Sequence, residues 1–546
     1  MIDKEMLYQN LARLVEAPSI SGTEDEVLGA YRIKELLMEL PYFRQHEENV
    51  MLIPMEGDPF DRVIVAAYLE GCPGNPDTVI LTGHYDVVDI EEFGGLKDIA
   101  YDIEKISERI NELPLSDEVK ADYESGNWYF GRGTIDMKFG HALSIELLRH
   151  YAEAGLDGNI LYVAVCGEET NSEGMLAAVP FFTEFAEKRG LRYRSLLLTE
   201  GYMVDGQEDG IRYIQYGGAG KVMPMFFCVG KTTHGEEPLL GMDANIMAAE
   251  VYREMVLAPE FCQQNHGITS APPAGLKLQD LKENYSLSTS LYAASYFNIA
   301  TIKMNPEETM KKLTAVAQRA FENAADLMRR KVEGFTELTG RVPAHYEAVP
   351  CVMTYGEMYK AVEKTFNGDL KAHMQECADK YMKENPELQD TCLKLMKHLY
   401  ELYEDKKPMI VVSVLPPYYP DVNIDTEDEA AAEMLENIDE LIEYAAKEHG
   451  ETVKTSEYYG ISDLCYTWLA EGLDFDALFE NLIGTDILYK FPTEALKKFK
   501  VPAVVIGASG KDMHKYTERL EKSYNFDVLP DLYIHYIDRL LGNKQQ

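Results

Sequence analysis

The stretch "VILTGHYDVVDI", residues 79–90, places two polar side chains at the end of an apolar run. The run is typical of a buried β-strand, and a glycine separates it from His84 and Asp86. Side chains alternate across a strand, so residues two positions apart point to the same face. One interpretation is a solvated strand end with a capping aspartate. The other is a metal ligand beside the group that orients its ring. Taken alone, the stretch favours the first.

Composition and charge exclude several classes of partner. With 546 residues the chain is too long for one hydrophobic core, so several domains are expected. A net charge of −41 disfavours nucleic acid and anionic membrane surfaces, because both require a basic patch. We therefore expect neither a nucleic-acid nor a membrane partner.

Cysteine usage and the N-terminus indicate the compartment. The eight cysteines are scattered without a CxxC pair, so a disulfide framework, zinc ribbon or redox motif has no support. The first 18 residues form an amphipathic helix pattern that lacks the apolar region of a signal peptide. No window approaches 18 uninterrupted apolar residues. These features predict a cytoplasmic location.

The order of strand-like and helix-like stretches along the chain predicts an interrupted α/β domain. Residues 1–213 alternate Val/Ile/Leu-rich strands with amphipathic helices, which indicates the first part of a catalytic α/β domain with a largely parallel sheet; residues 91–126 read as an insertion. Residues 214–332 read as a smaller inserted α+β domain. Residues 333–546 are expected to complete the catalytic domain, with a solvated helical elaboration at about 333–405.

Four further stretches end in carboxylates or imidazoles. They contribute, in chain order, Asp136, Glu168 and Glu169, Glu200, and His514. In doubly wound α/β folds the carboxyl ends of the strands form the ligand-binding edge, so all five segments should converge there. Each residue also has an ordinary explanation as a helix cap, a solvated turn or a surface charge. Five strand ends that each supply such a group instead favour a pair of zinc-like ions held by imidazole and carboxylate.

The segments that carry these residues resemble a known family. "PSISGTEDE", "TGHYDVV", "GRGTIDMKFG", "CGEETNSEG" and "SGKDMH" resemble, in order and spacing, the di-zinc metallohydrolases that include acetylornithine deacetylase, succinyl-diaminopimelate desuccinylase, aminoacylase and carboxypeptidase G. The long inserts and "GISDLCYTWL" are most similar to the arginine-utilisation RocB-type branch. The resemblance implies a zinc-peptidase-like three-layer α/β catalytic domain with an inserted α+β lid and dimerisation domain.

The resemblance also implies a role for each residue. Two divalent ions are expected, zinc first, with cobalt or manganese as alternatives. His84, Asp136 and Glu200 would hold one ion, and Asp136, Glu169 and His514 the other. Asp86 would accept the second ring N–H of His84. Glu168 would serve as general base to a metal-activated water. Arg132 and Lys138 are interpreted as structural or surface charges.

The inserted domain carries one further candidate and one departure from the family. His234 in "GKTTHGEEPLLGMDAN" resembles the histidine that stabilises the developing oxyanion, often from a partner subunit, so a homodimer through the lid is expected. Many family members also carry a lid arginine that grips the substrate carboxylate. The stretch "ASYFNIATIKMNPEE" lacks it, and only Asn298 or Lys303 could substitute.

The sequence thus predicts a metal-dependent hydrolase acting on a peptide or N-acyl amide bond in a small amino-acid-derived substrate. Exopeptidase, dipeptidase and deacylase activities remain open. The alternative from another class is a non-catalytic binding protein on an inherited hydrolase scaffold. Missing ligands would favour that alternative, and none is missing from the sequence.

Overall fold

The computed structural model describes residues 2–202 and 210–543, and the chain divides into two compact units. Unit 1 comprises Met1–Gly218, Val422–Leu469 and Pro492–Gln546, and unit 2 comprises Ala219–Asp421 and Ala470–Phe491. The first boundary lies close to the expected change at residue 213. The second differs from the expectation, because residues 333–421 belong to unit 2 rather than to the second part of the α/β domain.

An eight-stranded sheet forms the centre of unit 1, in the order β1-β2-β5-β3-β6-β16-β7-β15. Its strands are β1 (Val50–Pro54), β2 (Val63–Glu70), β3 (Asp77–His84), β5 (Asn159–Val165), β6 (Arg192–Leu198), β7 (Ile211–Gly218), β15 (Thr452–Tyr459) and β16 (Ala503–Ile506). Strand β3 pairs in parallel with both β5 and β6, and β16 pairs in parallel with β6. The carboxyl ends of these four strands therefore meet at one edge of the sheet.

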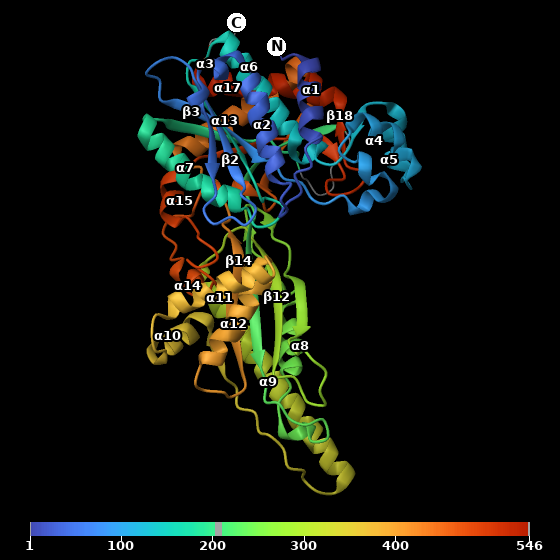
Figure 1. Ribbon diagram of the computed structural model, residues 1–546, viewed down its shortest axis with the longest axis vertical. Helices are drawn as coiled ribbons and strands as arrows, with labels where there is room; N and C mark the ends of the chain where they lie inside the picture. The colour runs from blue at the N-terminus through green and yellow to red at the C-terminus, as the bar shows by residue number, and fades with distance from the viewer. Residues whose placement is uncertain (1, 203–209, 544–546) are drawn as a thin grey trace. The chain divides into compact units, whose positions relative to one another are not determined.

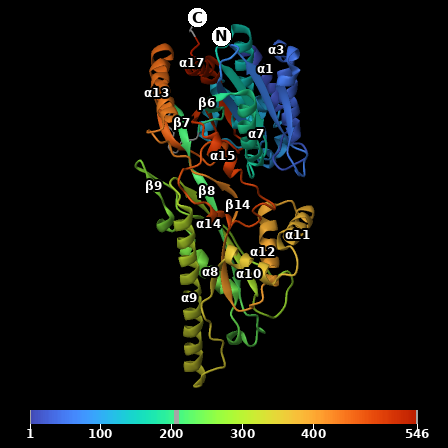
Figure 2. The same ribbon diagram turned by 90° about the vertical axis from the view of Figure 1, so that its left-hand side faces the viewer.

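Helices cover both faces of this sheet, which makes unit 1 a three-layer structure (Figure 2). The chain passes from β3 through α6 to β5 on one side of β3, and returns through α7 to β6 on the other side. Right-handed crossovers in opposite directions place α6 and α7 on opposite faces. The principal helices are α1 (Lys4–Val15), α2 (Val27–Glu39), α6 (Phe139–Ala154), α7 (Glu173–Arg189), α13 (Glu429–Tyr444), α15 (Thr493–Phe499), α16 (Lys522–Asp527) and α17 (Leu529–Leu541).

The insertion at residues 91–126 forms a small helical lobe of unit 1 (Figure 1). It contains η2 (Glu91–Ile99), α4 (Ile103–Arg109) and α5 (Asp117–Ser125). Apolar side chains from these elements pack with Phe130 of β4 (Trp128–Phe130) into a separate core. Strand β4 in turn pairs with β18 (Arg519–Glu521), which pairs with β17 (Gly510–Lys511). This small sheet ties the lobe to the segment that carries His514.

Unit 2 is built on a five-stranded sheet in the order β11-β12-β8-β14-β13. Its strands are β8 (Gly220–Val229), β11 (Ala274–Asp280), β12 (Tyr292–Thr301), β13 (Val352–Thr354) and β14 (Met409–Tyr419). Strand β14 pairs antiparallel with β8, whereas the sequence texture placed this stretch in the resumed α/β domain. The sequence pattern did not distinguish the two sheets, because β14 is buried along its whole length. A strand that is covered on both faces is a continuous apolar run in a parallel or an antiparallel sheet.

Helices also cover both faces of the unit 2 sheet (Figure 2). They are α8 (Ala244–Met255), α9 (Pro306–Thr339), α10 (Tyr355–Thr365), α11 (Leu370–Glu384) and α12 (Leu388–Leu402). Helix α9 begins with an Asn305 cap and has Pro306 in its first turn. The expectation of a solvated elaboration is wrong for α10–α12, because Met374, Cys392 and Leu395 lie in the core against the sheet. Within the described ranges, no helix has the length and apolar character to cross a membrane.

Candidate metal centre

The predicted site residues of unit 1 gather at the carboxyl edge of its sheet. His84 is the last residue of β3 and lies opposite Val165, the last residue of β5. Glu168 and Glu169 follow β5 directly, and Glu200 follows β6. Asp136 precedes α6, and His514 lies in the turn between β17 and β18.

These residues form two groups of potential metal ligands that share Asp136. His84, Asp136 and Glu200 make one group and Asp136, Glu169 and His514 the other, each with its ligand atoms within 4.8 Å of one another. The Nε2 atom of His84 lies 3.1 Å from Oδ1 of Asp136, and the Nε2 atom of His514 lies 3.1 Å from Oδ2. Ligand atoms at about 2.0–2.2 Å from a tetrahedral ion are roughly 3–3.5 Å apart, so the spacing fits two ions bridged by Asp136.

Unpaired buried atoms support the same conclusion. His84 Nε2, Asp136 Oδ1, Glu169 Oε1 and Glu200 Oε2 are buried without a hydrogen bond of normal geometry. A buried polar atom without a partner is costly, and a coordinated cation removes that cost. His514 differs from the other four, because its side chain is 54% exposed. The centre is therefore buried on one side and reaches solvent at His514.

The charges of the centre also suit divalent cations. Burial, followed by the nearby charge of Asp136, raises the pKa of Glu200 to about 8. Hydrogen bonds with Asp136 and Glu169 raise the pKa of His514 to about 10. Divalent ions at the two groups would reverse these biases, because their charge favours ionised carboxylates and neutral imidazoles.

The structure corrects the expected contact between His84 and Asp86. The Nδ1 atom of His84 lies 3.0 Å from the backbone oxygen of Asp86, and 3.6 Å from its carboxylate. The ring is therefore oriented by a backbone carbonyl, which serves the same purpose. The Asp86 carboxylate instead accepts hydrogen bonds from the Ser21 hydroxyl at 2.6 Å and from the backbone N–H groups of Glu168 and Glu169 at 3.3 and 3.2 Å. Asp86 thus holds the loop that presents both glutamates.

Glu168 stands beside the two groups without belonging to either. Among the described residues, both groups contain Asp136 but neither contains Glu168. Burial raises the pKa of Glu168 well above its ordinary value; His84 opposes this, and the charges of Asp463 and Glu200 add to it. Glu168 is therefore a buried carboxylate beside the ligand groups that would stay uncoordinated if ions were bound.

Two buried residues of the site were missed in the sequence. Asp463 lies in η8 (Asp463–Thr467), is 2% exposed, and neither of its carboxylate oxygens has a hydrogen bond of normal geometry. Burial raises its pKa to about 7, opposed by the His84 charge and the Ser172 hydroxyl. Tyr459, the last residue of β15, donates its hydroxyl proton to the carbonyl of Gly201 at 2.8 Å, beside Glu200. The only signal for Asp463 was its stretch "GISDLCYTWL", in which one aspartate in a polar turn carries no periodic pattern.

A buried ion pair joins the two segments that supply Asp136 and His514. Arg132 lies 2.6 Å from Glu518 and donates to the carbonyl of His514 at 3.0 Å. Glu518 also accepts from the backbone N–H of Ile135 at 3.3 Å. Lys138 is buried as well and donates to the carbonyl of Ala17. Arg132 and Lys138 therefore make structural contacts, which is one of the two interpretations drawn from the sequence.

Replacing Arg132 by methionine should lower the free energy of unfolding by about 3–5 kcal/mol, because it leaves the buried Glu518 carboxylate without its counter-charge. The double variant Arg132→Met, Glu518→Leu should recover most of that loss, since a buried ion pair replaced by apolar side chains is often neutral. Urea unfolding followed by circular dichroism measures both. Equal losses in the single and double variants would contradict the argument.

The predicted lid residues all belong to unit 2. His234 has a half-exposed side chain, and its Nδ1 accepts from the backbone N–H of Glu236 at 3.3 Å. Asn298 lies on β12, and its buried Oδ1 has no hydrogen-bond partner. Lys303 is exposed. An available amide oxygen at Asn298 is compatible with a substrate contact, but it is not a guanidinium fork.

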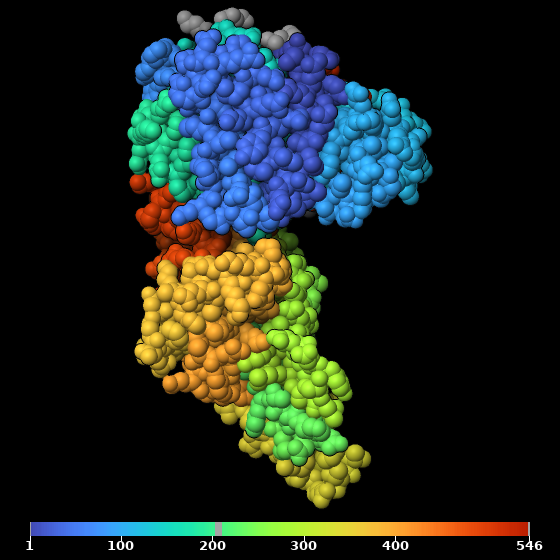
Figure 3. Space-filling model, in the orientation of Figure 1, coloured from blue at the N-terminus to red at the C-terminus, as the bar shows by residue number. Residues whose placement is uncertain are grey.

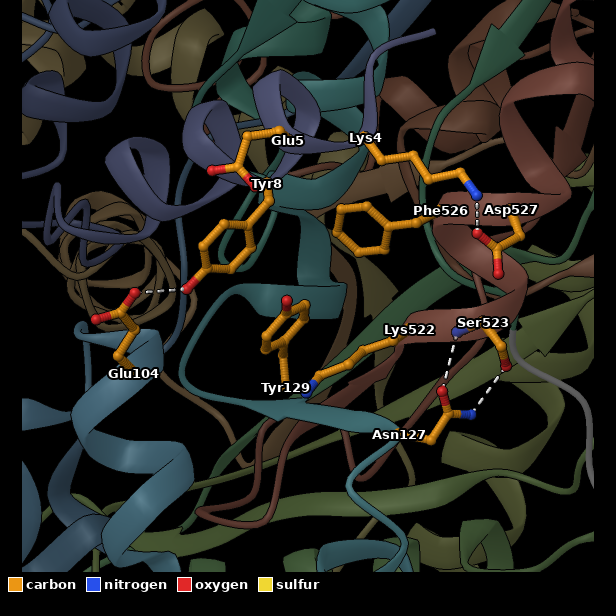
Figure 4. A pocket seen from close by; sticks show the side chains of 10 residues that line it. All are labelled: Lys4, Glu5, Tyr8, Glu104, Asn127, Tyr129, Lys522, Ser523, Phe526 and Asp527. Atoms are coloured by element: carbon orange, nitrogen blue, oxygen red, sulfur yellow. Dashed lines mark hydrogen bonds and ion pairs between the residues drawn. The ribbon is translucent and has the colours of Figure 1, made fainter. Parts of the chain in front are cut away.

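A cavity of about 550 Å³ lies on unit 1, away from the ligand groups (Figure 4). It is lined by residues of α1, α4, β4 and α16, including Tyr8, Tyr129 and Phe526. None of its lining residues belongs to either group of potential ligands. The cavity is therefore separate from the candidate metal centre.

An α/β unit whose strand ends bring together two ligand groups around one aspartate defines a metal-dependent hydrolase of the metallopeptidase type. Residues 80–508 match the model of peptidase family M20/M25/M40, and the chain belongs to this family.

Relatives span the whole chain. It is 33% identical to the uncharacterized protein YqjN of Bacillus subtilis (strain 168) over 548 residues, which cover 99% of this chain and 97% of that protein. It is 30% identical to protein RocB of the same organism over 526 residues, covering 95% and 92% of the two chains. The predicted resemblance to the family and its RocB-like branch is confirmed.

Solved structures confirm the fold class. The M20 family metallo-carboxypeptidase Sso-CP2 from Sulfolobus solfataricus superposes with a TM-score of 0.54 at 12% identity, covering 98% of this chain and 99% of that one. Aminopeptidase PepT from Bacillus cereus ATCC 10987 gives 0.53 at 13% identity, covering 99% of both chains. At these identities the likeness concerns the fold alone.

Proposed function

We propose that this protein hydrolyses a peptide or N-acyl amide bond in a small amino-acid-derived substrate. The observation that carries the proposal is the pair of ligand groups that share Asp136, with the uncoordinated Glu168 beside them. The family membership supports a hydrolase of this kind. One protein of solved structure with this fold is a tripeptidase and another is a di-peptidase, which supports small peptides as the substrate class.

The metals proposed are two divalent ions, with zinc first because the donors are imidazole and carboxylate. When bound, such ions supply Lewis-acid polarisation of the scissile carbonyl and activation of water. His84, Asp136 and Glu200 would hold one, and Asp136, Glu169 and His514 the other. Asp86 would act through other residues, since its carboxylate holds the glutamate loop and its backbone carbonyl contacts the His84 ring.

The proton transfers are assigned to Glu168. Its carboxylate would accept a proton from the attacking water and then deliver it to the leaving amine, so one residue acts first as base and then as acid. The backbone hydrogen bond to Asp86 fixes the loop position of Glu168. Its neighbour Glu169 is turned toward His514, at 3.0 Å, so Glu168 is the member of this glutamate pair that is free for the role.

His234 is proposed to stabilise the developing oxyanion, either within one chain or from a partner in a homodimer. His234→Ala should lower kcat by about 10²–10³-fold, the usual effect of losing one such donor, while the metal content stays unchanged. His266→Ala, at another histidine of unit 2, is the matched control. Mixing His234→Ala with a Glu168→Gln variant tests the partner arrangement, because only a shared site would restore activity. An unaltered kcat in His234→Ala would end the assignment.

The proposed activity is tested with purified protein. Metal content is measured first, and then amine release from a panel of dipeptides and N-acyl amino acids, with and without chelator. At least two ions per chain, those of the unit 1 centre, and chelator-sensitive release are expected. A protein that remains metal-free and inactive after zinc or cobalt is added would instead favour the non-catalytic alternative. The cytoplasmic location stays a prediction. The place in arginine utilisation, which the resemblance implies, also stays a prediction.

A further inference from the structure

The hairpin of α11 and α12 in unit 2 carries a second cluster of metal-ligating side chains. His373 and Cys377 lie one turn apart on α11, and His398 lies on α12. Residues four apart share a helix face, so both α11 side chains project toward the neighbouring helix. All three are half-buried. The surface of the segment that includes α11 and α12 is visible in Figure 3, coloured gold to orange.

The distances within this cluster approach those of a coordination site. Nε2 of His373 lies 2.8 Å from Nε2 of His398, and Sγ of Cys377 lies 3.9 Å from Nε2 of His373. All three ligand atoms fall within 4.8 Å of one another. For zinc bonds of about 2.0–2.1 Å to nitrogen and 2.3 Å to sulfur, tetrahedral geometry separates the ligand atoms by roughly 3.3–3.7 Å. The two observed separations, 2.8 and 3.9 Å, differ from these values by roughly half an ångström or less, so small side-chain movements would bring the His373 contacts to coordination geometry.

The surroundings favour ligation over a simple hydrogen bond. The Nε2 atom of His373 is shared by two contacts, a short one with His398 and a long one with the Cys377 thiol, and one ion between the three ligand atoms would satisfy all of them. The ring of His373 packs at 5.1 Å from the ring of Phe366, which holds it in place. The other nitrogen of His398, Nδ1, faces the Glu401 carboxylate at 3.9 Å. A carboxylate on that side is the usual outer partner of a metal-binding histidine.

We propose that His373, Cys377 and His398 bind one thiophilic transition-metal ion, with zinc as the fitting member. The fourth position is left to water, because the cluster is half-exposed and contains three ligating residues in the part of the chain that the structure describes. The ion joins α11 to α12 across their connection. The site belongs to unit 2, and its proposal does not depend on the hydrolase activity proposed for unit 1.

Cobalt provides a direct test, because only a thiolate ligand gives cobalt(II) a strong charge-transfer band in the near ultraviolet. The candidate metal centre of unit 1 has no cysteine ligand, so it cannot produce that band. Metal-stripped protein titrated with cobalt should develop the band, which saturates by three equivalents because three sites are proposed, and added zinc should abolish it. Cys377→Ser should remove the band and lower the zinc content from three ions per chain to two. His398→Ala should weaken binding at least tenfold.

Cys262→Ser is the matched control, because Cys262 is a half-buried cysteine of unit 2 outside the cluster, and it should retain the band. Alkylation of the wild-type protein removes any dependence on how the variants fold. Zinc should slow modification of Cys377 at least tenfold and leave Cys262 unaffected. Absence of the band in the wild type, its persistence in Cys377→Ser, or equal alkylation with and without zinc would overturn the proposal. Amine release should persist in Cys377→Ser, which separates this result from failure of the proposed hydrolase.

Discussion

Replacing Glu168 by glutamine is expected to lower kcat by about 10²–10⁴-fold, the range that general acid–base catalysis contributes. The amide has nearly the same shape as the carboxylate but cannot accept a proton at neutral pH. Glu168 belongs to neither ligand group, so both ions should remain bound. Metal analysis and kcat, measured on the same sample, therefore separate loss of the base from loss of the metals.

The pH dependence gives a second readout for Glu168. The proposed base must be ionised, so the activity of the wild type should fall as the pH decreases through the pKa of Glu168 in the enzyme. That acid limb should disappear from the residual activity of Glu168→Gln. Glu184→Gln, an exposed glutamate on α7, should keep both the rate and the limb. Full turnover by Glu168→Gln would contradict the assigned role.

The ligands could be predicted from the sequence because their positions follow from topology. Parallel strands place their carboxyl ends at one edge, so polar residues at the end of β3 and directly after β5 and β6 are expected to meet. His514 was reached differently, through its glycine-rich turn and the family resemblance. In the structure these residues form two groups, and the ligand atoms within each group lie within 4.8 Å of one another.

Other features depend on three-dimensional contacts that no local pattern encodes. Whether a histidine ring meets the carboxylate or the carbonyl of Asp86 depends on about half an ångström of loop geometry, here 3.6 against 3.0 Å. The sheet to which β14 belongs depends on its pairing with β8, although its apolar composition suits either sheet. Asp463 lies in a short turn far along the chain, and only folding brings its charge near Glu168 and Glu200.

The helices of unit 2 are another feature whose packing could not be predicted from the local sequence pattern. Its helices look polar because a helix on the outside of a sheet needs only one apolar stripe. Met374 and Leu395 supply that stripe and bury it against the sheet. The cluster of His373, Cys377 and His398 was also invisible, because two helices must pair before the three side chains meet.

Replacing Asp136 by alanine is expected to remove both ions at once, because the two oxygens of its carboxylate face different groups. Oδ1 lies 3.1 Å from Nε2 of His84, and Oδ2 lies 3.1 Å from Nε2 of His514. No other residue of the described chain belongs to both unit 1 groups. Losing both ions should lower activity by at least about 10³-fold, since metal-ion stabilisation of the transition state is worth several kcal/mol.

The comparison with single-group ligands makes this test specific to the bridge. Glu200→Ala and Glu169→Ala each remove a ligand from one group only, so each should lose one ion per chain and Asp136→Ala should lose two. Asp98→Ala, an exposed aspartate of the 91–126 lobe, controls for the loss of a negative charge and should lose none. Metal content by elemental analysis, on variants shown to be folded by circular dichroism, decides the matter. Asp136→Ala combined with Cys377→Ser, which removes the separate unit 2 site, should hold no ion. Retention of one tightly held ion by that double variant would mean that the Asp136 carboxylate serves a single site, and the bridged arrangement would have to be abandoned.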